Sequence, residues 1–231
     1  MLSAMGAAAQ SLPEPFEADY QAAKFLHTAK TRIQLVRAGE YYKYTMRSVV
    51  RGPFERGETY DCSVLRVVKN RLLPLAYVHE RKDRESSNVR TRFDWSHNTI
   101  ITALSDGRER EIKNVRGSVW DVLSIQLALL RDALSPEDSG PADYSVVNRG
   151  RLTSYRATRE GVETIEVAGG SVKTVKVKVV GPKHTNWFWF APDYTWLPVR
   201  MNIGEVVFDL VSPPGRTRRE ANAAVDRPPG C

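Results

Sequence analysis

The sequence predicts a mainly β protein in which a strongly curved antiparallel sheet, or a half-open barrel, wraps around one helix. Apolar and polar residues alternate along most of the chain, turn signals separate the alternating segments at short intervals, and one central segment has a helical period. The patterns correspond to about ten strands, and a sheet of that size tends to curl or close.

The strands are predicted from alternation with a period of two residues. In NVRTRFDW (88–95), Val89, Phe93 and Trp95 fall on one face, and charged residues fall on the other. The same pattern occurs in TRIQLVRA (31–38), EYYKYTMRSVV (40–50), SVKTVKVKVV (171–180) and GEVVFDLV (204–211). Turn signals lie between the segments at 37–40, 51–58, 105–109, 168–171 and 202–205. Strands this closely spaced favour antiparallel meanders over βαβ units.

The helix is predicted at 118–134, SVWDVLSIQLALLRDAL. Its apolar residues recur every three or four positions, and it is apolar nearly all round. Ser118 and Asp121 have the spacing of a capping box, and Ser135-Pro136 ends the pattern. A helix without a polar face must be covered, so we expect the sheet to enclose it.

The chain is expected to form one β domain at 10–212. Residues 1–9 resemble the end of a signal peptide with a small-x-small processing site, which predicts export to the periplasm. Residues 213–231 have no periodicity and many Pro and Arg residues, which predicts a disordered tail.

Composition excludes several classes of function. The net charge is +7, but like charges form no long block, so we expect no nucleic-acid partner. No apolar run is long enough for a transmembrane segment. The histidines are scattered, and no Cys/His cluster has metal spacing, so we expect neither a metal nor a cofactor. The sequence leaves open whether Cys62 and Cys231 form a disulfide.

Four motifs in a fixed order resemble a known family. They are PFEADY (15–20), FDW (93–95), DVLSIQLALLR (121–131) and WFAPDYTWLPVRM (189–201). With these motifs the chain resembles the bacterial domain-of-unknown-function 3108 family of exported proteins. The resemblance implies export and a β-rich, barrel-like fold, and it brings no activity with it.

The aromatic run at 187–190 is interpreted as core. In an extended strand, Trp187 and Trp189 point to one face, and Phe188 and Phe190 to the other. Both faces therefore require apolar surroundings, and we expect Trp187 and Trp189 to be structural.

The residues after the following turn are the predicted ligand site. We expect Tyr194 and Trp196 to emerge at the rim, beside an edge or bulge caused by the proline of LPVR. Arg200 would contact an anionic group there, with Arg90 and Arg92 as companions. No residue set indicates catalysis: the chain has no nucleophile elbow, phosphate loop or defined pair of acids.

These features predict an exported envelope protein that binds a lipid, an acyl chain or a cell-envelope glycan in or beside the curved sheet. One alternative is a polysaccharide-active lyase or hydrolase of the envelope. The other is a structural partner of an envelope assembly that docks through an edge strand.

Overall fold

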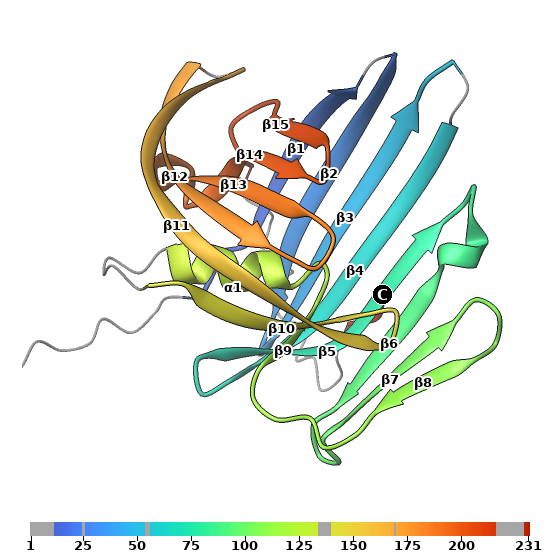
Figure 1. Cartoon of the computed structure of the whole chain (residues 1–231). Coiled ribbons are helices and arrows are strands. Elements are labelled where there is room, and N and C mark those ends of the chain that lie inside the picture. Colours follow the sequence, from blue (N-terminus) through green and yellow to red (C-terminus); the bar gives the residue numbers. More distant parts are fainter. Residues whose placement is uncertain (1–11, 25, 54–55, 134–139, 169, 216–228) are drawn as a thin grey trace, which may run out of the picture.

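The chain forms one large open sheet that curls around a single helix (Figure 1). The computed structural model describes residues 12–24, 26–53, 56–133, 140–168, 170–215 and 229–231. The expected signal remnant at 1–9, and residues 216–228 of the expected tail, lie outside the described residues.

The sheet has fifteen strands in the described residues, where the sequence patterns indicated about ten. Their bounds are β1 (Phe16–Lys24), β2 (His27–Ala38), β3 (Tyr41–Arg51), β4 (Arg56–Val68), β5 (Arg71–Arg81), β6 (Val89–Asp94), β7 (Thr99–Leu104), β8 (Glu109–Ile112), β9 (Val119–Asp121), β10 (Ala142–Asn148), β11 (Arg151–Val167), β12 (Gly170–Val180), β13 (Thr185–Ala191), β14 (Leu197–Ile203) and β15 (Val206–Leu210). Short turns without Gly or Pro contribute to the difference. For example, Lys69 and Asn70, both at positive φ, join β4 directly to β5.

Two meanders build the sheet. The strand order is β8-β7-β6-β5-β4-β3-β2-β1-β15-β14-β13-β12-β11-β10-β9, so β1 and β15 join the N-terminal meander to the C-terminal one. Neighbouring strands are antiparallel except β9 and β10, which are parallel. The expected antiparallel, barrel-like architecture is therefore confirmed, and the barrel is open.

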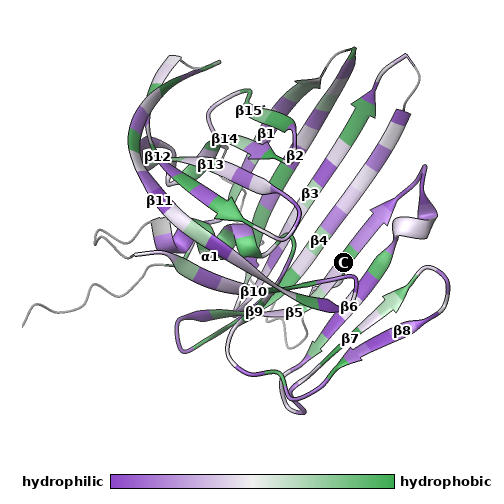
Figure 2. Ribbon diagram, viewed as in Figure 1, coloured by the Kyte–Doolittle hydropathy of each residue, from purple (hydrophilic) through white to green (hydrophobic). Residues whose placement is uncertain are grey.

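The alternation seen in the sequence separates the two faces of the sheet, as the banding along β1–β4 shows in Figure 2. The concave face carries the apolar set. Its deeply buried members include Tyr20, Ile33, Leu35, Tyr42, Leu65, Phe190 and Met201. Charged pairs such as Arg32 with Asp19, and Arg47 with Glu58, lie on the convex face.

The helix α1 (Ile125–Ala133) packs inside the curve, as expected, but it is shorter than the predicted segment (Figure 1). Val119–Asp121 instead forms β9, paired with β10. The predicted Ser118–Asp121 capping box is wrong, because the reciprocal pair is one turn later. Asp121 Oδ1 accepts the Ser124 amide at 2.8 Å, and the Asp121 amide donates to Ser124 Oγ at 3.1 Å. Within the described residues, no helix is long and apolar enough to span a bilayer.

The two ends of the sheet overlap face to face instead of pairing. Val119 and Val147, from β9 and β10, pack against Phe93, Ile100 and Val115 from the β6–β8 end. Across the interior, the Ser63 hydroxyl on β4 donates to Asp121 Oδ1 at 2.7 Å. Side-chain packing thus joins the ends where a closed barrel would have a backbone ladder.

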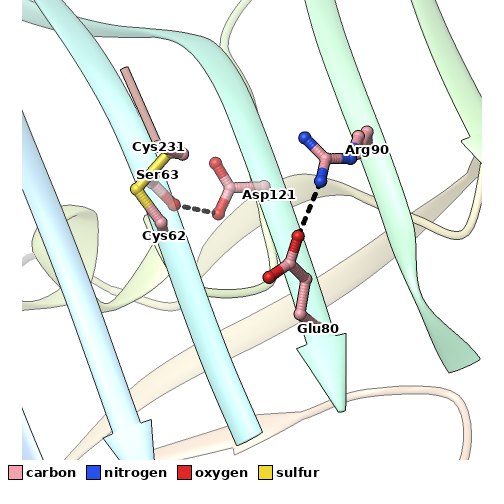
Figure 3. The surroundings of a disulfide bond; sticks show 6 residues. All are labelled: Cys62, Ser63, Glu80, Arg90, Asp121 and Cys231. Atoms are coloured by element: carbon pink, nitrogen blue, oxygen red, sulfur yellow. Dashed lines mark hydrogen bonds and ion pairs between the residues drawn. A yellow bond between two sulfur atoms is a disulfide. The ribbon is translucent and has the colours of Figure 1, made fainter. Parts of the chain in front are cut away.

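A disulfide joins Cys62 to Cys231, which settles a pairing that the sequence left open (Figure 3). Cys62 lies on β4 between Asp61 and Ser63, and it is completely buried. The last residue of the chain is thereby attached to the middle of the N-terminal meander.

Candidate functional site

A hollow with a mixed apolar and cationic lining lies between α1 and the concave side of β10–β14. We call it the helix cavity, and its volume is about 840 Å³. This volume lies within the range of ordinary small-molecule sites. Apolar side chains from the helix and the strands form its floor. They are Val122, Ile125, Leu129, Val146, Val179, Phe188 and Ile203.

The rim of the helix cavity is cationic. Arg110, Arg149, Arg151, Lys183 and His184 line it, and no carboxylate occurs among its described lining residues. Most of these residues come from two hairpin turns, NRGR at 148–151 and GPKH at 181–184. In a meander, every second turn lies at the same edge of the sheet. The β10–β11 and β12–β13 turns are such a pair, so the fold gathers their positive charges over one opening.

Two of the rim arginines are held in place by the protein itself. Arg149 Nη1 donates to the Ser87 carbonyl, and Arg110 Nη1 donates to the Arg149 carbonyl, both at 2.8 Å. Gly150, at φ +70°, makes this possible, because a Cβ there would lie 2.5 Å from Arg110 Cβ. These contacts fix the β10–β11 turn against the opposite end of the sheet.

The other two strongly basic rim residues are uncommitted. Within the described part of the chain, the side chains of Arg151 and Lys183 have no hydrogen bond or ion pair. Their charges are therefore available to an anionic group of a ligand, for which Arg provides a bidentate fork and Lys a point charge.

A buried polar cluster lies on β4 and β5, beneath the concave surface. Asp61 Oδ1 accepts a hydrogen bond from the Tyr77 hydroxyl at 2.7 Å and lies 2.8 Å from His79 Nδ1. Burial, and then the charge of Asp61, raises the pKa of Tyr77. None of the three residues is among the described lining residues of the helix cavity. Their hydrogen bonds join β4 to β5.

Asp121 forms a second buried polar centre, at the N-terminal side of α1. The amides of Leu123 and Ser124 and the hydroxyls of Ser63 and Ser124 all donate to its carboxylate. Burial raises the pKa of Asp121, and these hydrogen bonds act in the opposite direction. The carboxylate positions the helix that forms one wall of the cavity.

The residues of the predicted ligand site do not come together. Arg90 pairs with Glu80 at 2.7 Å, as Figure 3 shows. Arg92 lies 3.9 Å from Asp94. Both arginines are on β6, which is seven positions from β14, and thus from Arg200, in the strand order.

In the C-terminal meander, Arg200 pairs with Asp209 and donates to the Glu166 carbonyl. Tyr194 borders a separate hollow of about 270 Å³, and Trp196, at φ 63°, is half-buried against the core. None of the five predicted residues lines the helix cavity.

The expectation that Trp187 and Trp189 are core residues holds only in part, because Trp189 packs against the main core without being buried in it and Trp187 is outside that described cluster. Both are half-buried, whereas Phe188 and Phe190 on the opposite face are 5% and 1% exposed. The Trp189 indole donates to Glu163, and Lys176 Nζ lies 5.1 Å from its ring centroid. The convex face accommodates these tryptophans through charged neighbours, so apolar cover is not required.

The rim residues of the helix cavity were missed by the sequence analysis. A signal for them exists, because basic residues occupy two turns of neighbouring hairpins. A strand pattern does not predict which turns lie at the same end of a curled sheet. It therefore cannot show that NRGR and GPKH border one cavity.

These features define an open, barrel-like β protein with an internal helix and a cationic cavity beside it. Residues 16–211 match the model of the family described as "Protein of unknown function (DUF3108)", so the chain belongs to this family. A search of the curated proteins finds no match.

The fold is also similar to a solved structure. It is the crystal structure of a beta-barrel-like protein of the domain of unknown function DUF1849 from Brucella abortus. The TM-score is 0.58 at 12% sequence identity, and the alignment covers 86% of this chain and 95% of that one. At this identity the likeness concerns the fold alone.

Proposed function

We propose that this protein binds an anionic amphiphile, a lipid or acyl compound of the cell envelope, in the helix cavity. The observation that carries the proposal is the lining, which combines an apolar floor with a rim of cations and no described carboxylate. The floor would bury hydrocarbon, and Arg151 and Lys183 would bind the acidic head group. The uncharged polar side chains of Gln126, Asn148, Thr153, Tyr155 and Asn186 also line the cavity, so the choice of an amphiphile over a glycan rests on the apolar floor, which a glycan would leave without hydrocarbon to bury.

We further propose that the protein is exported to the periplasm. The support is the Cys62–Cys231 disulfide, because disulfides persist in oxidising compartments and are rare in the cytosol. Cell fractionation followed by thiol alkylation tests this. A periplasmic protein with both cysteines blocked to alkylation supports it, and a cytosolic protein with free thiols contradicts it.

The test of binding uses alkyl phosphates below the concentrations at which they aggregate, with titration calorimetry as the readout. Arg151→Glu and Lys183→Glu should each weaken binding of dodecyl phosphate by roughly tenfold, about 1.4 kcal/mol. Each removes a cation that contacts the head group and adds a repelling charge. Because head-group binding is electrostatic, added salt should also weaken the wild-type complex.

The matched control is Lys30→Glu. Lys30 is exposed on the convex face of β2, opposite Gln21 and Val49, and its substitution makes the same charge change away from the cavity. It should leave binding unchanged. Equal weakening by all three variants would show only an effect of net charge, and no binding to the wild type would reject the proposed function.

A further inference from the structure

A second hollow lies on the same concave face, near the ends of β1–β4. We call it the upper cavity, and its volume is about 520 Å³. Ala22, Ala29, Met46, Val50, Val206 and Phe208 form its apolar walls.

Five polar residues, His27, Thr28, Ser48, Thr59 and Arg81, also line the upper cavity, and two of them have partners within the protein. The Ser48 and Thr31 hydroxyl oxygens lie 2.8 Å apart in a hydrogen bond. Arg81 Nε and Nη2 donate to the two carboxylate oxygens of Asp83 at 2.9 and 2.7 Å, which offsets its charge. This lining suits hydrocarbon better than a charged head group.

The linings of the two cavities adjoin at the β14–β15 turn. Ile203 lines the helix cavity and Val206 lines the upper cavity, and these residues are directly opposite each other in the ladder. The next pair on that face is Met201 with Phe208. Directly opposed side chains of a ladder share a face with Cβ atoms about 5 Å apart. The apolar floor of one cavity therefore continues into the wall of the other.

We infer that the two cavities hold one long-chain ligand. Its anionic head lies at the rim of the helix cavity, and its hydrocarbon chain crosses Ile203 and Val206 to end against Ala22. From Val179 on β12 to Ala22 on β1 there are four inter-strand spacings. At about 4.8 Å each, they separate these residues by roughly 20 Å along the curved sheet, which is the reach of an extended hexadecyl chain. This inference rests on the proposed function and adds chain length as the feature that the protein selects.

The experiment compares octyl, dodecyl and hexadecyl phosphate, again below their aggregation concentrations. Wild-type affinity should rise by about fourfold for each added methylene that becomes buried, and the rise should continue beyond the dodecyl chain. Val50→Trp fills the part of the upper cavity beside Ala29 and Ala22, where the hexadecyl chain ends. It should weaken hexadecyl phosphate binding by at least about tenfold and leave octyl phosphate binding unchanged.

The adjacent residue supplies the matched control. Val49 pairs with Lys30 and faces the convex side, so Val49→Trp makes the same change on the same strand outside the cavity. It should bind all three compounds like the wild type. Ala29→Trp, at the residue opposite Val50, is a second way to block the cavity if Val50→Trp does not fold.

The outcomes separate the two proposals. If dodecyl and hexadecyl phosphate bind equally tightly, or if the blocked variants keep the gain with chain length, the long-chain inference is overturned while binding in the helix cavity stands. If the wild type binds none of the three compounds, the proposed function fails as well.

Discussion

The two faces of β13 carry similar aromatic residues in opposite environments. Phe188 and Phe190 stack on each other, with ring centroids 6.0 Å apart, inside the main core. Trp187 and Trp189 alternate with them on the convex face and remain half-buried beside charged residues. The larger rings are thus the more exposed ones. Which face a residue occupies follows from its parity in the strand, and size and hydrophobicity do not decide it.

The largest effect should come from the concave face. Phe190→Ala removes a ring that is 1% exposed and packed in the main core, so the free energy of unfolding should fall by about 3–5 kcal/mol. Urea unfolding measures it. Trp187→Ala, on the same strand, is the control and should cost much less. Equal losses for the two variants would mean that the faces do not differ energetically.

One residue on the convex face, Cys62, is also fully buried. Its side chain points away from the concave face that carries Asp61 and Ser63. The disulfide links residues 169 positions apart, so it restricts the unfolded chain over a long loop. Cys231→Ser should therefore lower the free energy of unfolding by about 2–4 kcal/mol.

The loss from Cys231→Ser should be reproduced by reducing the wild-type protein, and a reductant should have no effect on the variant. A variant as stable as the oxidised wild type would contradict a stabilising effect of the disulfide.

The alternation made much of the fold predictable from sequence, and its limits are equally physical. It predicted the mainly β fold, the curved sheet and the enclosed helix, because burial on one face leaves a period of two residues in strands such as β6. It could not separate β9 from the helix. In VWDVLSIQ, apolar residues suit either element, and the hydrogen bonds that the Asp121 carboxylate accepts from the Leu123 and Ser124 amides decide where the turn begins.

The site was less predictable than the fold. Aromatic residues and arginines drew attention to 187–200, yet Arg200 is committed to Asp209 across one ladder. The cationic rim instead combines Arg151 and Lys183 from different hairpins with Arg110 from the far end of the sheet. Their meeting depends on the closure of the curve, which side-chain contacts between β8 and the β10–β11 turn determine.

An interior carboxylate should show the opposite pH dependence from the surface ones. Burial raises the pKa of Asp121, so the folded state holds its proton more tightly than the unfolded chain does. Its contribution to stability is then full below the ordinary aspartate pKa of about 4 and is lost as pH rises through the raised value. By contrast, hydrogen bonds from Ser96 and His97 lower the pKa of Asp94 to about 2, so its contribution is lost as pH falls.

Asp121→Asn isolates the contribution of Asp121 to the pH dependence of stability. The amide oxygen can still accept from Leu123, Ser124 and Ser63, so the cap remains while the titrating group is gone. The free energy of unfolding of the wild type minus that of Asp121→Asn should fall as pH rises from acid to neutral. Asp121→Ala, which removes the cap as well, should be less stable than Asp121→Asn at every pH. Parallel curves for the wild type and Asp121→Asn would contradict the raised pKa.

The smallest effect should come from Trp189→Ala. The variant loses a cation–π contact with Lys176 and a hydrogen bond to Glu163, both at the half-exposed convex surface. A contact of this kind contributes about 0.5–1 kcal/mol, and water can replace the lost hydrogen bond. The total cost should be about 1 kcal/mol, several-fold below that of Phe190→Ala. Lys176→Met provides a check, because it removes the cation and keeps most of the side-chain length. If the ring depends mainly on the cation, Lys176→Met and Trp189→Ala should have similar costs, and the double variant should cost less than their sum. A loss of about 3 kcal/mol or more for Trp189→Ala would show that the convex tryptophans belong to a core after all.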